Sequence, residues 1–167
     1  MDRFRLSSIA SLCEQLKRGP NRLCLRQLLG IEFLLSLIEA HKQYPFEFVC
    51  NAITGFRPTH EGDGHGRLLD GELLITDLVL LAEDLSENAR LPLNAWIEPV
   101  YTVADLAERF DVSTKTIFRW RRRGLAGWKL RGTDERMRLL FADRCVRRFV
   151  AQNADLVTRG SNFSQLT

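Results

Sequence analysis

Apolar residues recur every three or four positions through the first half of the chain, which is the spacing of an α-helix with one buried face. This pattern predicts a first helix that ends at Gly19-Pro20 and a second over about residues 22–42. Pro45 is expected to open a third helix, which ends near Gly55. A fourth helix is predicted over about residues 72–85, and its wide leucine stripe favours a central core helix over a partner-binding face. The stripe consists of Leu74, Leu78, Leu81 and Leu85.

The segment between the third and fourth predicted helices, RPTHEGDGHGRLLDG, breaks this periodicity and holds four of the chain's eleven glycines. Its side chains with metal-ligating atoms are His60, Glu61, Asp63 and His65. Their spacing matches no metal motif and no cysteine accompanies them, so we expect a polar loop and no metal site.

Residues 91–99 carry two prolines within eight positions, which disfavours a helix and predicts a linker. Ser86, shortly before it, is interpreted as the cap of a short helical turn. The predicted organisation is a helical domain over residues 1–90, the linker, a second domain over residues 100–153 and a tail over residues 154–167.

Beyond the linker, the pattern predicts two short helices joined by a tight turn. Thr102 is a good N-cap for the segment VADLAERF, with Asp105 three residues on as a partial capping box. Ser113 caps the segment TKTIFRWRRR, which Gly124 ends, and Asp111 stands in the turn, where the backbone needs a positive φ. Two helices connected in this way form a helix-turn-helix, an arrangement that many DNA-binding proteins use.

The helix-turn-helix also determines which side chains face outward. The steep crossing of the two helices needs a small residue, here Ala107, and apolar contacts, here Leu106, Phe110, Val112, Ile117 and Trp120. The second helix then exposes Thr114, Lys115, Phe118, Arg119 and Arg122, with the orientations of Arg121 and Arg123 left open, and Arg123 is included among the candidate DNA-binding residues. A basic face of this kind suits the DNA major groove, and an ordinary solvated helix end is the alternative interpretation.

Two short segments, residues 128–131 and 137–141, flank a Gly-Thr-Asp-Glu turn and predict a β-hairpin. Its basic residues are Lys129, Arg131, Arg136 and Arg138. A last helix is predicted over residues 142–153. The predicted fold class is therefore mainly α, with an N-terminal helical domain followed by a winged helix-turn-helix whose wing is the short β-hairpin.

Charge divides the chain near the predicted linker. Residues 1–99 hold ten Lys and Arg against fourteen Asp and Glu, whereas residues 100–167 hold fourteen against seven. This asymmetry predicts that the second unit faces a polyanion.

Other classes of protein find little support in the sequence. It has no secretory signal and no membrane-spanning run, and its four cysteines form no C-x-x-C pair, so we expect reduced thiols in a cytoplasmic protein. No catalytic Ser/His/Asp set, phosphate-binding glycine loop or paired carboxylates indicate an enzyme, and we expect no cofactor.

The run YTVADLAERFDVSTKTIFRWRRRGLAG and the following hairpin resemble the DNA-binding domain of the MerR and excisionase group. In that group T-x-x-x-L-A opens the first helix, S-x-x-T-[IL]-x-x-[WY] the second, and a Gly-Leu pair precedes the wing. The matching residues are Thr102, Leu106, Ala107, Ser113, Thr116, Ile117, Trp120, Gly124 and Leu125.

This resemblance implies base and phosphate contacts from Thr114, Lys115, Phe118, Arg119 and Arg122, and DNA-backbone contacts from Lys129, Arg131 and Arg138. The chain departs from MerR-type regulators in two respects. Its motif lies on the C-terminal side, and no long dimerising helix or cysteine-bearing loop follows. Metal or drug sensing is therefore not expected.

A second resemblance involves the segments PFEFVCNAITGF, DGELLITDLVLLAEDLSE and FVAQNADLVTRGSNFSQLT, which are similar to the N-terminal part of bacterial sigma-factor-like proteins. The chain is then expected to be an N-terminal fragment or a protein without the core sigma regions, and polymerase binding is not carried over to it.

The leading expectation is a sequence-specific transcription factor that binds double-stranded DNA. An excisionase-like architectural protein and a helix-turn-helix protein–protein adaptor are the alternatives. RNA polymerase and a second copy of the chain stay open as further partners.

Overall fold

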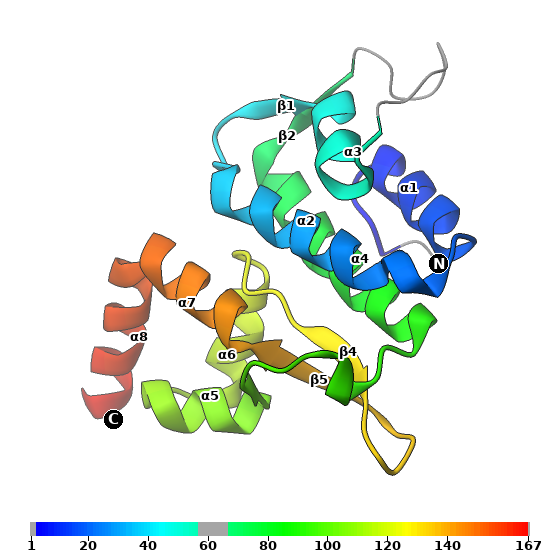
Figure 1. The fold of residues 1–167 in the computed structure, drawn as a ribbon. Coiled ribbons are helices and arrows are strands. Elements are labelled where there is room, and N and C mark those ends of the chain that lie inside the picture. Colours follow the sequence, from blue (N-terminus) through cyan, green and yellow to red (C-terminus); the bar gives the residue numbers. More distant parts are fainter. Residues whose placement is uncertain (1–2, 57–66, 167) are drawn as a thin grey trace.

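The computed structural model describes residues 3–56 and 67–166. Over these residues the protein is mainly helical, with two small antiparallel sheets (Figure 1). The elements of the first half are α1 (Ser7–Lys17), a 3-10 turn η1 (Asn21–Leu23), α2 (Cys24–Leu37), β1 (Gln43–Pro45), α3 (Phe46–Thr54), β2 (Leu68–Asp70) and α4 (Gly71–Ala89). Those of the second half are η2 (Leu93–Ala95), β3 (Val100–Tyr101), α5 (Val103–Phe110), α6 (Thr114–Arg121), β4 (Trp128–Arg131), β5 (Met137–Ala142), α7 (Asp143–Gln152) and α8 (Ala154–Leu166).

Helix α4 is the central element, in contact with α1, α2 and β4. The prediction of a core helix is confirmed, because Leu74, Leu78 and Leu81 are completely buried. The helix is longer than predicted and ends at Ala89, where Arg90 adopts a left-handed conformation.

The interpretation of Ser86 as a cap was wrong. This residue lies buried inside α4, and its hydroxyl donates to the carbonyl of Ala82 at 2.8 Å. The same hydroxyl accepts the backbone N–H of Lys129 in β4, also at 2.8 Å. Ser86 therefore connects α4 to a strand more than 40 residues further along the chain, a contact that no local sequence pattern reveals.

The second helix is shorter than predicted and ends at Leu37, because the following chain turns to pair β1 with β2. Gly71 closes this turn by donating its N–H to the carbonyl of Lys42 at 2.8 Å. A Cβ atom on Gly71 would lie only 2.2 Å from the carbonyl oxygen of Glu39, so a larger residue would displace the turn. The third helix begins after Pro45 and ends at a left-handed Gly55, as predicted.

The second half contains a three-stranded sheet with the order β3-β5-β4. The predicted hairpin is confirmed as an antiparallel pair, in which Trp128 lies opposite Leu140 and Arg131 opposite Met137. Strand β3 was not predicted. The expected last helix corresponds to α7, and the predicted tail begins with a further helix, α8.

The two halves share one apolar core. Trp128, Leu130 and Leu140 of the hairpin belong to the same buried cluster as the central leucines of α4. The predicted linker is packed onto the hairpin, because the carbonyl of Leu91 accepts the N–H of Arg131 at 2.8 Å. The division into two domains stays a prediction, but the two parts are in extensive contact.

The four cysteines lie among the described residues, and all are buried free thiols. Burial raises the pKa of Cys13, Cys24 and Cys50 to about 11, so these thiols stay protonated at neutral pH. Within the described ranges, no helix is both long and apolar enough to cross a membrane.

Candidate nucleic-acid interface

Local hydrogen bonds define the beginnings of α5 and α6 and the turn between them. The hydroxyl of Thr102 accepts the N–H of Asp105 at 3.0 Å, and the Asp105 carboxylate accepts the N–H of Thr102 at 2.9 Å, a complete capping box. Asp111 adopts φ 54° in the turn, and Ser113 caps α6 by accepting the N–H of Thr116 at 3.1 Å. All three predictions are confirmed, and each cap is worth about 0.5–2 kcal/mol.

The inward side of α6 is held by an apolar cluster shared with α5, β5 and α7. Leu106 and Ile117 are completely buried, and Trp120 is 2% exposed. The Trp120 ring lies 5.7 Å from the rings of both Phe110 and Phe149, measured between centroids. This packing fixes the rotation of α6 about its axis and therefore determines which side chains reach solvent.

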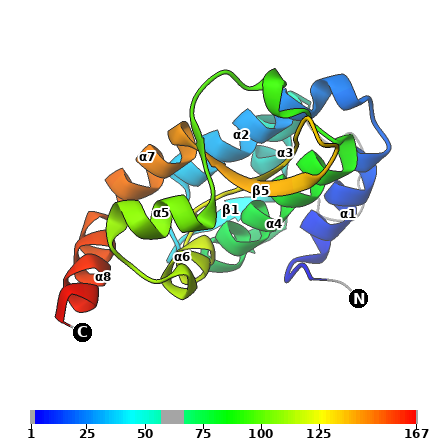
Figure 2. The same ribbon diagram turned by 90° about the horizontal axis from the view of Figure 1, so that it is seen from below.

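Helix α6 lies against α5, with α4 on one side of it and α8 on the other (Figure 2). Thr76 of α4 donates its hydroxyl to the carbonyl of Arg122 at 3.4 Å. On the other side Gly160 of α8 approaches closely, since a Cβ atom there would lie 3.2 Å from the Trp120 ring and 3.8 Å from Thr116. Solvent therefore reaches α6 on the face between α4 and α8.

This outward face, hereafter the basic face, contains the five residues that the sequence predicts to be exposed, together with Arg123, whose orientation the sequence left open. They are Thr114, Lys115, Phe118, Arg119, Arg122 and Arg123, and all are exposed in the structure. Four of them are cations, and none of these four forms an ion pair with any described residue. The basic face therefore presents positive charge with no acidic partner.

Arg121, whose orientation the sequence left open, points the other way. Its guanidinium forms an ion pair with Glu83 of α4, with 2.7 Å between Nη2 and Oε2. Both side chains are largely buried, at 16% and 11% exposure. Arg121 therefore fastens α6 to α4 and does not belong to the basic face.

The cations of the hairpin are mostly paired within the protein. Lys129 Nζ lies 3.8 Å from the same Glu83 carboxylate. Arg131 Nη1 lies 3.2 Å from the Glu135 carboxylate, and Arg138 Nη1 donates to the Asp134 carboxylate at 2.9 Å. The hydrogen bond from Arg138 is the main reason why the pKa of Asp134 falls to about 2.

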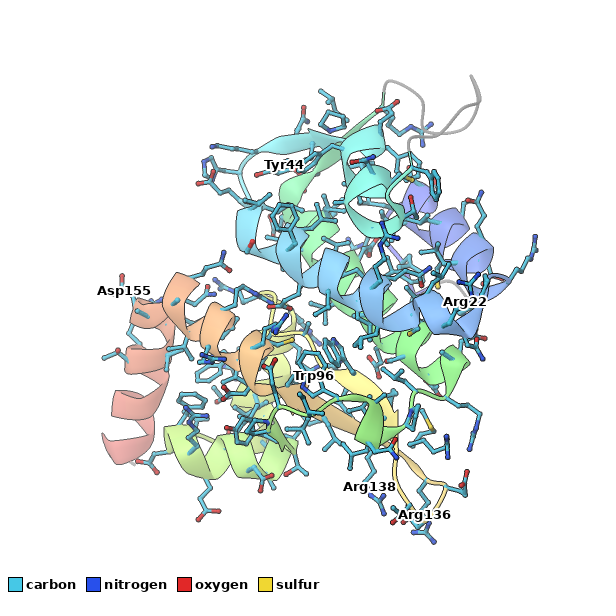
Figure 3. The ribbon with its side chains drawn as sticks, in the orientation of Figure 1. Arg22, Tyr44, Trp96, Arg136, Arg138 and Asp155 are labelled. Atoms are coloured by element: carbon cyan, nitrogen blue, oxygen red, sulfur yellow. The ribbon has the colours of Figure 1, made fainter. Side chains whose placement is uncertain are left out.

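Arg136 differs from these three residues because its side chain has no ionic partner among the described residues. It lies with Arg138 at the tip of the hairpin, which projects from the molecule (Figure 3). Arg136 was noted in the hairpin but not among the predicted DNA contacts. Asp134 and Glu135 stand in the turn between Arg131 and Arg138, and these acids were the signal in the sequence that the two arginines would be paired.

No group of acidic, histidine or cysteine side chains within the described residues could hold a metal ion. The loop side chains His60, Glu61, Asp63 and His65 lie outside the described residues.

No protein-family model, curated protein or solved structure matches this chain.

Proposed function

We propose that the chain is a DNA-binding protein in which α5, α6 and the β4–β5 hairpin form a winged helix-turn-helix. The observation that supports this best is the basic face of α6, beside one exposed aromatic ring. Its four cations, Lys115, Arg119, Arg122 and Arg123, are exposed and form no ion pair within the described part of the chain. Positive charge of this density attracts the phosphates of double-stranded DNA, and a helix of this width enters the major groove.

Within this proposal we favour a sequence-specific transcription factor, whose role is like that of the upstream part of a sigma-factor-like protein. The predicted contacts on α6 and the turn after it keep their support, because all six side chains are exposed: Thr114, Lys115, Phe118, Arg119, Arg122 and Arg123. The proposed backbone contacts of the hairpin are weaker, because the three predicted cations there already have acidic neighbours.

The proposal is tested by the salt dependence of binding. Each phosphate that a protein cation neutralises adds about 0.9 to the slope of log K against log salt concentration. We expect the triple variant Lys115→Ala/Arg122→Ala/Arg123→Ala to lower this slope by roughly 3, if each cation meets one phosphate. Fluorescence anisotropy with a labelled random-sequence duplex, titrated at several salt concentrations, measures it.

The chain offers a matched control that removes the same charge elsewhere. Arg18, Arg22 and Arg26 are exposed and lie on the N-terminal helical part, and Arg22 is far from α8 (Figure 3). The triple Ala variant at these positions should keep the wild-type slope. Equal losses in both triple variants would contradict the proposal that the basic face binds DNA. If the unchanged chain shows no salt-sensitive binding, DNA binding itself is contradicted and the protein–protein adaptor is favoured.

The class of DNA site separates the remaining alternatives. A selection of bound genomic fragments should enrich promoters if the chain is a transcription factor. Enrichment of recombination sites, together with strong bending of circularly permuted fragments, would instead identify an excisionase-like architectural protein.

A further inference from the structure

Phe118 is the apolar exception on the basic face. Its side chain is 50% exposed, and it belongs to neither of the two buried apolar clusters. It takes part in no ring–ring contact among the described residues. Phe118 therefore does not cover the edge of either core cluster.

The helical geometry of α6 determines which face carries Phe118. Lys115, Phe118, Arg119 and Arg122 follow the spacing i, i+3, i+4 and i+7, so they lie along one face of the helix. Two unpaired cations, Lys115 and Arg122, lie next to the ring on that face. If the cations bring this face to the DNA, the ring meets the base edges.

Few groups in the major groove offer an apolar contact to such a ring. Phosphates and the donor and acceptor atoms of base edges require polar partners, and a phenyl ring carries no polar group. The 5-methyl group of thymine is the one alkyl group that the four common bases expose there. A ring at this position can thus distinguish thymine from the other bases through its methyl group.

We propose that Phe118 contacts the 5-methyl group of a thymine in the major groove, and that the preferred duplex has thymine at one fixed position for this reason. This inference rests on the proposed DNA binding and adds a base preference and the residue responsible for it. The neighbouring cations supply affinity, and Phe118 supplies selectivity at this position.

The test begins with a duplex that the full chain selects from a pool of randomised sequences. Each thymine of that duplex is then replaced in turn by uracil, which pairs in the same way but lacks the methyl group. We expect one replacement to weaken binding by about fourfold, the factor expected for losing one buried carbon group of this size. Replacements at the other thymines should leave the affinity within about twofold, a margin small compared with one lost methyl contact.

The variant Phe118→Ala assigns the effect to this side chain. It should bind the thymine and uracil duplexes equally, with an unchanged salt slope, whereas Phe118→Leu should keep part of the preference. The ring is half exposed, so Phe118→Ala should also keep the wild-type thermal unfolding midpoint within a few degrees, as surface substitutions generally do.

The outcomes separate this inference from the proposed function. Salt-sensitive DNA binding without an enriched thymine, or without any uracil effect, overturns the role of Phe118 and leaves DNA binding standing. A uracil effect that persists in Phe118→Ala overturns it as well, because another residue then reads the methyl group. The absence of salt-sensitive binding by the unchanged chain overturns both.

Discussion

Helix α6 and the β4–β5 hairpin are both rich in basic residues, but they use these residues differently. On α6 and the turn after it, four cations face solvent without an ion pair to any described residue, and Arg121 has an acidic partner in Glu83. In the hairpin, three of the four cations have acidic neighbours, and Arg136 is the exception among the described residues. The number of Lys and Arg residues in a segment therefore does not measure the positive charge that it offers to a partner.

Glu83 is the residue that most clearly connects the two regions. Its carboxylate, on α4, lies against Arg121 of α6 and Lys129 of β4. The contact holds the helix and the hairpin on the same support, so the geometry of the proposed DNA-binding surface depends on a residue of the N-terminal half.

The largest expected effect is on stability. Glu83→Ala would leave the largely buried Arg121 guanidinium without its counter-charge, and Nε of Arg121 already has no hydrogen-bond partner among the described residues. Breaking a buried pair in this way costs about 3–5 kcal/mol, so we expect a loss of that order in the free energy of unfolding, measured by urea denaturation.

Glu87→Ala, one turn further along α4, is the control for this prediction. Glu87 is exposed and forms no ion pair among the described residues, so its removal should change the free energy of unfolding by less than about 0.5 kcal/mol. Similar values for the two variants would show that the Glu83–Arg121 pair contributes no more than a surface charge.

A smaller effect is expected on DNA affinity. Arg119→Ala should cost about 1–3 kcal/mol on the preferred duplex and relax the sequence preference, because we propose that this exposed side chain reaches base edges. Arg131→Ala should weaken binding to all duplexes alike, and by less, because Arg131 is already paired with Glu135. Gel shifts on the preferred and a random duplex measure both, and equal losses on both duplexes for both variants would contradict this division.

The smallest effect is a gain. Asp134→Asn should release Arg138 and remove a negative charge from the hairpin tip, so we expect DNA affinity to rise by a factor of about two to three, as for one weak surface pair. The pKa of Asp134 is about 2, so this carboxylate stays ionised at pH 5 and above. Its pairing is lost only as the pH falls towards 2.

The gain should therefore be the same at pH 5.5 and pH 8, measured by anisotropy at constant salt. Glu87→Gln, which removes a negative charge from α4, should produce no comparable gain. An unchanged affinity of Asp134→Asn would show that the hairpin tip does not approach DNA.

Much of the second half could be predicted because its signals are local. The caps at Thr102 and Ser113 join atoms only three residues apart, and Asp111 tolerates the left-handed turn by itself. The buried stripe of Ile117 and Trp120 follows from helical spacing. These features define which way α6 faces, and with it the candidate site.

The sequence by itself thus predicted helices α1 to α7, the hairpin and most of the exposed side chains on α6, but not the helix α8. Only the tertiary structure decided where the second helix stops, how Ser86 is used and which basic residues keep their charge free. The reason is distance along the chain. Glu83, the partner of Arg121, is 38 residues away, and Arg148 of α7 pairs with Glu32 of α2, which is 116 residues away. The acids that neutralise these cations are therefore found only when α4 and α2 pack against the second half.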